Sequence, residues 1–136
     1  MDLFDLLERL RRGVDAHDIE AVAACFAPEY RNETPAHPGR DFEGQEQVRT
    51  NWTRIFVGVP DISATVMRTA LDGDVIWSEW ELSGHRPDGV EQVLRGAIIF
   101  GANADQFAWA RFYLEPVDCG GGGVDAAVGR IVKAER

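Results

Sequence analysis

The sequence has few residues that could build a disulfide framework or a metal site. Its two cysteines, Cys25 and Cys119, are 94 positions apart and form no CxxC pair. The histidines His17, His37 and His85 are scattered along the chain without the spacing of zinc ligands. We therefore predict no metal and no other cofactor, and we expect Cys25 to be a small buried thiol.

The chain also lacks a surplus of basic charge and any long hydrophobic run. Its 136 residues include 14 Lys and Arg against 23 Asp and Glu, which gives a formal net charge of −9. This acidic balance argues against nucleic acid or an anionic membrane as a partner, because both require clustered basic residues. No run approaches the roughly 18–20 apolar residues of a membrane span, and residues 1–5 do not resemble a signal peptide. These absences predict a reduced, cytoplasmic protein.

Motifs for covalent or phosphate chemistry are also missing. No Ser or Cys lies in a nucleophile elbow, and no glycine-rich loop leads from a strand into a helix. The four glycines at 120–123 follow the last expected strand and are typical of a flexible linker. We therefore predict one domain over residues 1–118, and a Gly-rich linker with a weakly helical tail over residues 119–136.

The first half of the chain has helical patterns. Leucines from Leu3 to Leu10 follow the helical period, and Gly13 is expected to close this first helix. A second helix is expected after Asp15 or Asp18, with its apolar face reaching Phe26. A short extended piece at residues 30–34 and a third helix at about residues 44–56 follow.

The second half of the chain has the residue pattern of β-strands. Alternating apolar residues predict four antiparallel strands at residues 62–71, 75–83, 90–100 and 107–117. The Asp72-Gly73 pair is a strong hairpin signal, and the Pro87-Asp88-Gly89 segment turns the next pair. The order of helices followed by strands predicts an α+β fold.

Several local motifs resemble the SnoaL-like branch of the nuclear-transport-factor-two-like superfamily. They are residues 15–21, 26–30, 44–48, 60–61, 73–74 and 111–115, and together they extend the resemblance over about residues 3–118. The resemblance implies a cone-shaped, curved mixed or antiparallel sheet packed on three N-terminal helices. Such a cystatin-like roll encloses an apolar pocket and is commonly dimeric. The fold alone defines no function, since isomerases, cyclases, hydrolases and non-catalytic modules share it.

Two chemistries of these relatives can be tested position by position. Ketosteroid isomerases require a Tyr and two Asp where this chain has Leu10, Thr34 and Gly96, so their proton-transfer groups are missing. Epoxide hydrolases of the limonene type use an Arg-x-Asp where this chain has Glu79-Trp80-Glu81, and an Asp where it has Phe112. Neither mechanism can therefore operate here as it does in those relatives, because neither set of catalytic residues is complete in this chain.

The resemblance also implies which side chains face the pocket. It places Trp77, Glu79 and Glu81 inward, and Trp80 and Trp109 on the outer face of the sheet. Two exposed tryptophans would make a poor solvent surface, so we predict a homodimer through the outer sheet face.

Glu79 and Glu81 are the candidate catalytic residues. Being two positions apart on one strand, they share a face about 7 Å apart, and an apolar cavity would raise the pKa of one carboxyl enough for acid or base chemistry. Alternatively, Glu79 pairs with Arg95 or Arg111, and Glu81 lies at the wet rim.

The expected substrate-binding residues are mostly aromatic, with a few hydrogen-bonding groups. They are Tyr30, Asn32, His37, Trp52, Phe56, Trp77, Gln92 and Phe112. This set suits a hydrophobic ligand carrying a few oxygens. Alternatively, these residues have structural roles: Tyr30 packs at the sheet edge, Asn32 forms hydrogen bonds with loop backbone, His37 faces solvent, and the tryptophans are core or interface residues.

These residues lead to two hypotheses. The first is a cofactor-independent isomerase, cyclase or hydrolase that acts on a hydrophobic metabolite by acid/base chemistry at Glu79 and Glu81. The second is a non-catalytic module of the same fold that binds a small molecule or dimerises. Loss of the isomerase groups favours the second, and inward-facing carboxylates would favour the first.

Overall fold

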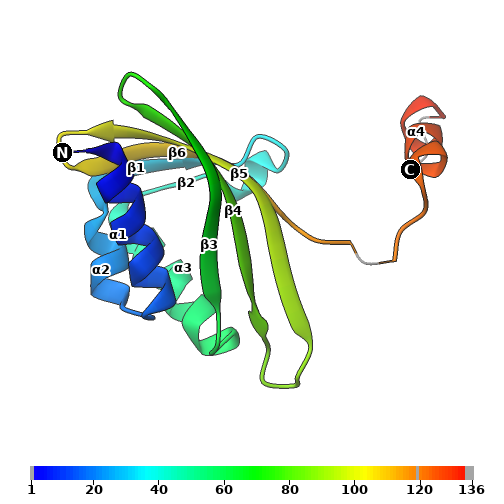
Figure 1. Cartoon of the computed structure of the whole chain (residues 1–136), viewed down its shortest axis with the longest axis horizontal. Helices are drawn as coiled ribbons and strands as arrows, with labels where there is room; N and C mark the ends of the chain where they lie inside the picture. The colour runs from blue at the N-terminus through cyan, green and yellow to red at the C-terminus, as the bar shows by residue number, and fades with distance from the viewer. Residues whose placement is uncertain (1, 119, 134–136) are drawn as a thin grey trace.

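A curved six-stranded sheet wraps around three helices in the computed structural model, which describes residues 2–118 and 120–133 (Figure 1). The helices lie on the concave side of the sheet, and a fourth helix lies apart at the C-terminus. The elements are α1 (Leu3–Asp15), α2 (Ile19–Ala24), β1 (Phe26–Glu33), the 3-10 helix η1 (Pro38–Arg40), β2 (Phe42–Glu43), α3 (Gln45–Gly58), β3 (Ser63–Asp72), β4 (Val75–His85), β5 (Glu91–Asn103), β6 (Gln106–Pro116) and α4 (Val124–Val132).

The sheet confirms the predicted α+β class and the four antiparallel strands. Its strand order is β2-β1-β6-β5-β4-β3, and every neighbouring pair is antiparallel except β1 and β6, which are parallel. Strands β3 and β4 turn at Gly73, and the turn between β4 and β5 contains Gly89; both glycines have the positive φ that such turns favour. The sheet is therefore mixed, and it forms one curved wall.

The segment after α2 differs from the prediction. Phe26 is buried, but it begins strand β1 instead of extending the apolar face of α2, which ends at Ala24. Pro28 lies within β1, where the pairing with β6 shifts register between Phe26 and Arg31. Because a proline cannot donate a hydrogen bond to a sheet, this irregularity lets the strand contain it.

The helices α1 and α2 are capped by aspartates and meet at a glycine. Asp2 accepts a hydrogen bond from the backbone of Phe4, and Asp18 accepts one from Ala21. Gly13 is not the predicted cap of α1, which continues to Asp15. A Cβ atom at Gly13 would lie 3.1 Å from Cγ2 of Val22, so the missing side chain allows α2 to pack closely on α1.

The hydrophobic core fills the space between the helices and the concave face. Residues of α1 such as Leu6 and Val14 pack with buried residues of the central strands. The rings of Phe100 and Phe107 are stacked with centroids 4.3 Å apart, and Cys25 is fully buried as predicted. Burial raises the pKa of the Cys25 thiol to about 11, which makes it unreactive at neutral pH.

The C-terminal segment stands away from this body (Figure 1). Helix α4 contains no buried residue, and its apolar side chains Val124, Val128 and Ile131 are exposed. The expected helical tail is thus present up to Val132, while Cys119 and residues 134–136 lie outside the described residues. Among the helices described, none has both the length and the apolar character needed to cross a membrane.

Candidate functional site

A cavity of about 290 Å³ opens between helix α3 and the concave face of the sheet. Trp52 from α3 and Phe112 from β6 are among its aromatic walls, and both also border a deeper apolar recess of about 30 Å³ near Trp80. The lining is mostly aromatic and aliphatic, with a few polar groups. It comprises Phe26, Tyr30, Asn32, Thr34, Arg40, Phe42, Val48, Asn51, Trp52, Ile55, Leu82, Leu94, Phe112 and Leu114.

Four expected site residues line this cavity: Tyr30, Asn32, Trp52 and Phe112. Inward residues alternate along β1, so Tyr30 and Asn32 reach the same wall while Arg31 faces away. The Tyr30 hydroxyl donates a 2.7 Å hydrogen bond to Oδ1 of Asn32, and burial raises the pKa of Tyr30 above its usual range. The phenol is therefore neutral and holds the Asn32 amide in one orientation.

The polar groups of the cavity can donate hydrogen bonds. With its oxygen occupied by Tyr30, the Asn32 amide nitrogen has no partner within residues 2–118 and 120–133, and neither has the Thr34 hydroxyl. The amide oxygen of Asn51 accepts from Gln47, which likewise orients its nitrogen as a donor. Arg40 adds a cation, whereas the described part of the chain contributes no Asp, Glu, His, Cys or Lys to the lining. Such a cavity suits a ligand with acceptor oxygens.

The expected inward orientation of Glu79 and Glu81 is wrong. Along β4 the buried residues are Ile76, Ser78, Trp80 and Leu82, so the odd-numbered side chains point outward. The pairing of β4 with β5 gives the same orientation. Leu82 lies directly opposite Leu94, which lines the cavity, and paired residues point to the same face of a sheet. A one-residue error in strand parity reverses every side chain of a strand.

On the outer face both glutamates are near arginines. Oε2 of Glu81 lies 2.6 Å from Nε of Arg95, and Oε1 of Glu79 lies 3.6 Å from Nε of Arg68. Arg95 was one of the partners foreseen for Glu79, and it pairs with Glu81 instead. Both carboxylates thus lie outside the cavity, each beside a guanidinium, which removes the argument for acid/base catalysis at this pair.

Four other expected residues do not line the cavity. Trp77 is outward and half exposed, and Phe56 stacks on His17 with ring centroids 5.0 Å apart. Gln92 lies beyond Leu94 on β5, opposite Gly84. Nε2 of His37 lies 3.1 Å from Oε1 of Glu115.

Several lining residues were not among the binding residues predicted from the sequence. Asn51 and Ile55 lie three and seven positions after Val48, so the helical period of α3 could have identified them. Arg40 and Phe42 come from the loop and short strand after β1, where no periodicity signals orientation. Leu82 lies on the face of β4 opposite to Glu79 and Glu81, the two residues that were expected to face the pocket.

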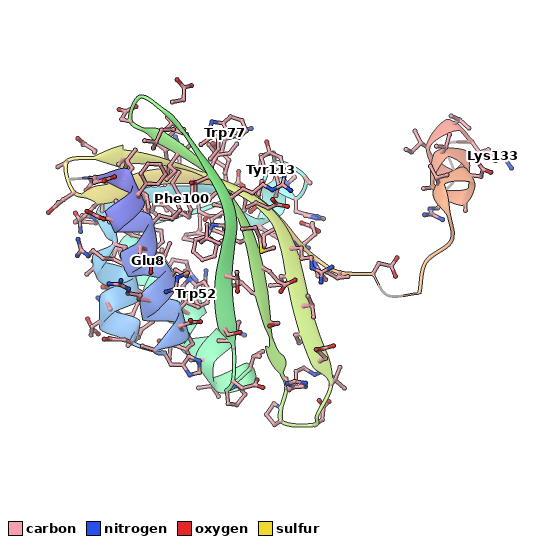
Figure 2. The ribbon with its side chains drawn as sticks, in the orientation of Figure 1. Glu8, Trp52, Trp77, Phe100, Tyr113 and Lys133 are labelled. Atoms are coloured by element: carbon pink, nitrogen blue, oxygen red, sulfur yellow. The ribbon has the colours of Figure 1, made fainter. Side chains whose placement is uncertain are left out.

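The outer sheet face also has a hollow, about 470 Å³ in volume and wide open to solvent. Trp77, Ala97 and Ala70 contribute its apolar part, and Arg68 and Glu79 contribute charges. In Figure 2, Trp77 and Tyr113 lie at the outer side of the sheet, while Trp52 and Phe100 lie between sheet and helices.

Of the two tryptophans behind the predicted dimer, Trp109 faces outward as expected and Trp80 does not. Trp80 is buried on the concave side, where its indole Nε1 donates to Oγ of Ser78 at 2.8 Å. Trp109 does face outward, but it covers the backbone of Gly101 so closely that a Cβ there would lie 2.1 Å from the indole. The exposed outer aromatics are Trp77 and Tyr113.

The fold is shared with solved proteins described as NTF2-like. A Mycobacterium tuberculosis protein in complex with estradiol-17beta-hemisuccinate superposes with a TM-score of 0.70 at 21% identity, covering 81% of this chain and 91% of that one. IdmH, a putative polyketide cyclase from Streptomyces antibioticus, has a TM-score of 0.73 at 16% identity and covers 84% and 92%. A hypothetical protein with a ketosteroid isomerase-like fold from Catenulispora acidiphila, in complex with trimethylamine, has a TM-score of 0.66 at 15% identity and covers 79% and 84%.

The SnoaL-like domain family matches residues 7–110, and the chain belongs to this family. No curated protein matches the sequence. Within the described part of the chain, no group of three or more His, Cys, Asp or Glu could hold a metal ion. The structure also explains why Gly96 cannot be replaced by the acid of the isomerases: its φ is +150°, and a Cβ would lie 2.0 Å from the Tyr113 carbonyl oxygen.

Proposed function

We propose that the cavity between α3 and the sheet binds a small, largely apolar molecule that carries acceptor oxygens. The observation that carries this proposal is the lining itself, in which hydrogen-bond donors at Asn32, Thr34 and Asn51 interrupt apolar walls. Two relatives by fold are complexes with small organic molecules, which supports a small-molecule ligand. The absence of a carboxylate or imidazole from the lining favours binding over acid/base catalysis.

An isomerase, cyclase or hydrolase reaction in the same cavity is the second candidate. Donors aimed at one carbonyl oxygen stabilise the negative charge that develops there, even without a protein base. The putative polyketide cyclases among the fold relatives make an intramolecular ring closure the natural reaction to consider. In this version the catalytic groups are Asn32 and Thr34, and Glu79 and Glu81 take no part.

Native mass spectrometry of the purified protein tests the proposal. We expect a co-purified organic molecule on the wild-type chain and its loss from Leu114→Trp, because Leu114 lines both the cavity and the deeper recess. The matched control is Tyr113→Trp, which introduces the same side chain at the neighbouring, outward position. Equal ligand occupancy in both variants would refute the proposed cavity, and a ligand returned in altered chemical form would favour the enzyme.

We also propose that the outer sheet face joins two copies of the chain. Trp77 is 50% exposed and Tyr113 is 40% exposed on this face. Arg68, Glu79, Glu81 and Arg95 surround the apolar residues with charges of both signs. An apolar patch rimmed by paired charges is typical of an interface between protein chains.

A further inference from the structure

Arg40 is a cation at the candidate cavity without a partner of its own. It ends the 3-10 helix η1, lines the cavity and is exposed. Within residues 2–118 and 120–133 its side chain makes no hydrogen bond or ion pair. Most other arginines there do pair with a carboxylate, namely Arg11, Arg12, Arg31, Arg49, Arg68, Arg86, Arg95 and Arg111.

The unpaired state of Arg40 does not come from a shortage of acids. The chain has 23 acidic against 14 basic residues, and two carboxylates lie close to Arg40 in sequence. Oδ1 of Asp41 accepts a 2.7 Å hydrogen bond from the backbone N–H of Thr34, and this bond holds the loop between the two residues. Glu43 lies 3.5 Å from Arg31 across β1 and β2. Both neighbouring acids are thus used elsewhere, and the guanidinium is left to the cavity.

The rest of the lining complements a negative charge at this point. Among the residues that the structure describes, no carboxylate lines the cavity. The amide nitrogens of Asn32 and Asn51 add neutral donors, while Trp52 and Leu114 offer apolar surface. An apolar body with one acidic group satisfies both parts of this lining, because a guanidinium binds a carboxylate through two parallel hydrogen bonds.

We propose that the ligand is a small organic carboxylate, with its apolar body in the cavity and its carboxylate on Arg40. This inference rests on the proposed function and adds the charge of the ligand and the residue that selects it. Arg40 is then a specificity-determining residue, since a neutral analogue would fill the cavity without pairing with the guanidinium.

Two probes of nearly equal shape test this, 2-naphthoate and 2-naphthamide, because they differ in charge at one group. We expect wild-type protein at pH 7 and low ionic strength to bind the acid about fivefold more tightly than the amide, as an ion pair at an exposed site gives. In Arg40→Gln this preference disappears while the affinity for 2-naphthamide stays the same. Added salt should reduce the preference in wild type only. Isothermal titration calorimetry measures all of these affinities.

The control is Arg54→Gln, which removes the same charge from an exposed arginine of α3 that does not line the cavity. It should keep the preference for the acid. Equal affinity of wild type for both probes, or an unchanged preference in Arg40→Gln, would overturn the inference and leave the proposed cavity intact. Failure of both probes to bind would instead count against the proposed function, and the inference would fall with it.

Discussion

Ser78 is the residue on which the buried indole of Trp80 depends. Its Oγ accepts from Nε1 of Trp80 at 2.8 Å and donates to the carbonyl oxygen of Ile98 at 2.7 Å. This short relay satisfies two polar groups inside an otherwise apolar wall. It also explains how a tryptophan expected outside can lie inside, since its N–H has a partner there.

Replacing Ser78 tests this relay. In Ser78→Ala the Trp80 indole N–H is buried without an acceptor, so we expect the free energy of unfolding to fall by about 1–3 kcal/mol. Urea denaturation followed by tryptophan fluorescence measures the change. The control Ser63→Ala removes a hydroxyl from an exposed position of β3 and should have almost no effect. Equal stability of the two variants would show that the relay contributes nothing.

At the level of elements, the positions of the β-strands could be predicted from the sequence. Which side chains of β4 face the cavity could not. Alternating apolar residues located β3 to β6 to within a few residues, and Phe112 of β6 lines the cavity as expected from the resemblance. Strand β4 contains large apolar residues on both faces, including Trp77 and Trp80, so hydrophobicity alone does not distinguish its sides. The alignment to relatives then placed Glu79 and Glu81 on the wrong face.

The loop between β1 and α3 shows a different limit. Arg40 and Phe42 reach the cavity because Asp41 braces the loop through Thr34 and because β2 pairs with β1. Both causes are contacts between residues apart in sequence, so no local pattern reveals them. Half of the predicted binding residues do line the cavity, because a local repeat places them there. Each of these residues follows the regular period of a strand or a helix: Tyr30, Asn32, Trp52 and Phe112.

The connection between α3 and β3 is attached to the end of β4 by a pair that depends on pH. Oδ2 of Asp61 lies 2.8 Å from Nδ1 of His85, and its Oδ1 accepts from the His85 backbone at 2.6 Å. The hydrogen bonds from His85 lower the pKa of Asp61, and the hydrogen bond to Asp61 raises the pKa of His85. Protonated His85 therefore stabilises the fold below its unfolded pKa, and this is lost as pH rises through the raised value.

This pair predicts a pH-dependent effect of His85→Gln. The melting temperature should fall more at about pH 5.5 than at about pH 8.5, because the imidazole loses its proton as pH rises through its raised pKa. At still lower pH the contribution of Asp61 also disappears, because its carboxyl becomes protonated. Differential scanning calorimetry across this range measures the effect. A decrement in melting temperature that is the same at both pH values would contradict the prediction.

Helix α4 is the element of the whole molecule that has no buried residue and lies apart from the sheet and the other helices (Figure 1). Helix α4 buries no side chain, and the SnoaL-like match ends at residue 110. We expect a chain of residues 1–118 to melt within about 2 °C of the full chain, because removing a helix without buried surface removes little stabilisation. A clearly lower melting temperature would show that the tail packs against the body in solution.

The outer face predicts the oligomeric state. If two copies pack through Trp77 and Tyr113, light scattering at micromolar concentration should report a dimer, and Trp77→Arg should report a monomer with an unchanged circular dichroism spectrum. Phe4→Arg is the control, because Phe4 is also an exposed aromatic but lies on α1. A monomeric mass for the wild-type chain would refute the dimer.

The central claim is that a ligand binds on the concave side of the sheet, and a crystal structure grown with 2-naphthamide tests it most directly. The account predicts density for the ring between Trp52 and Leu114, with the amide oxygen of the probe near the Asn32 nitrogen. Density against Trp77 and Glu79 in the outer hollow, with an empty concave cavity, would contradict it.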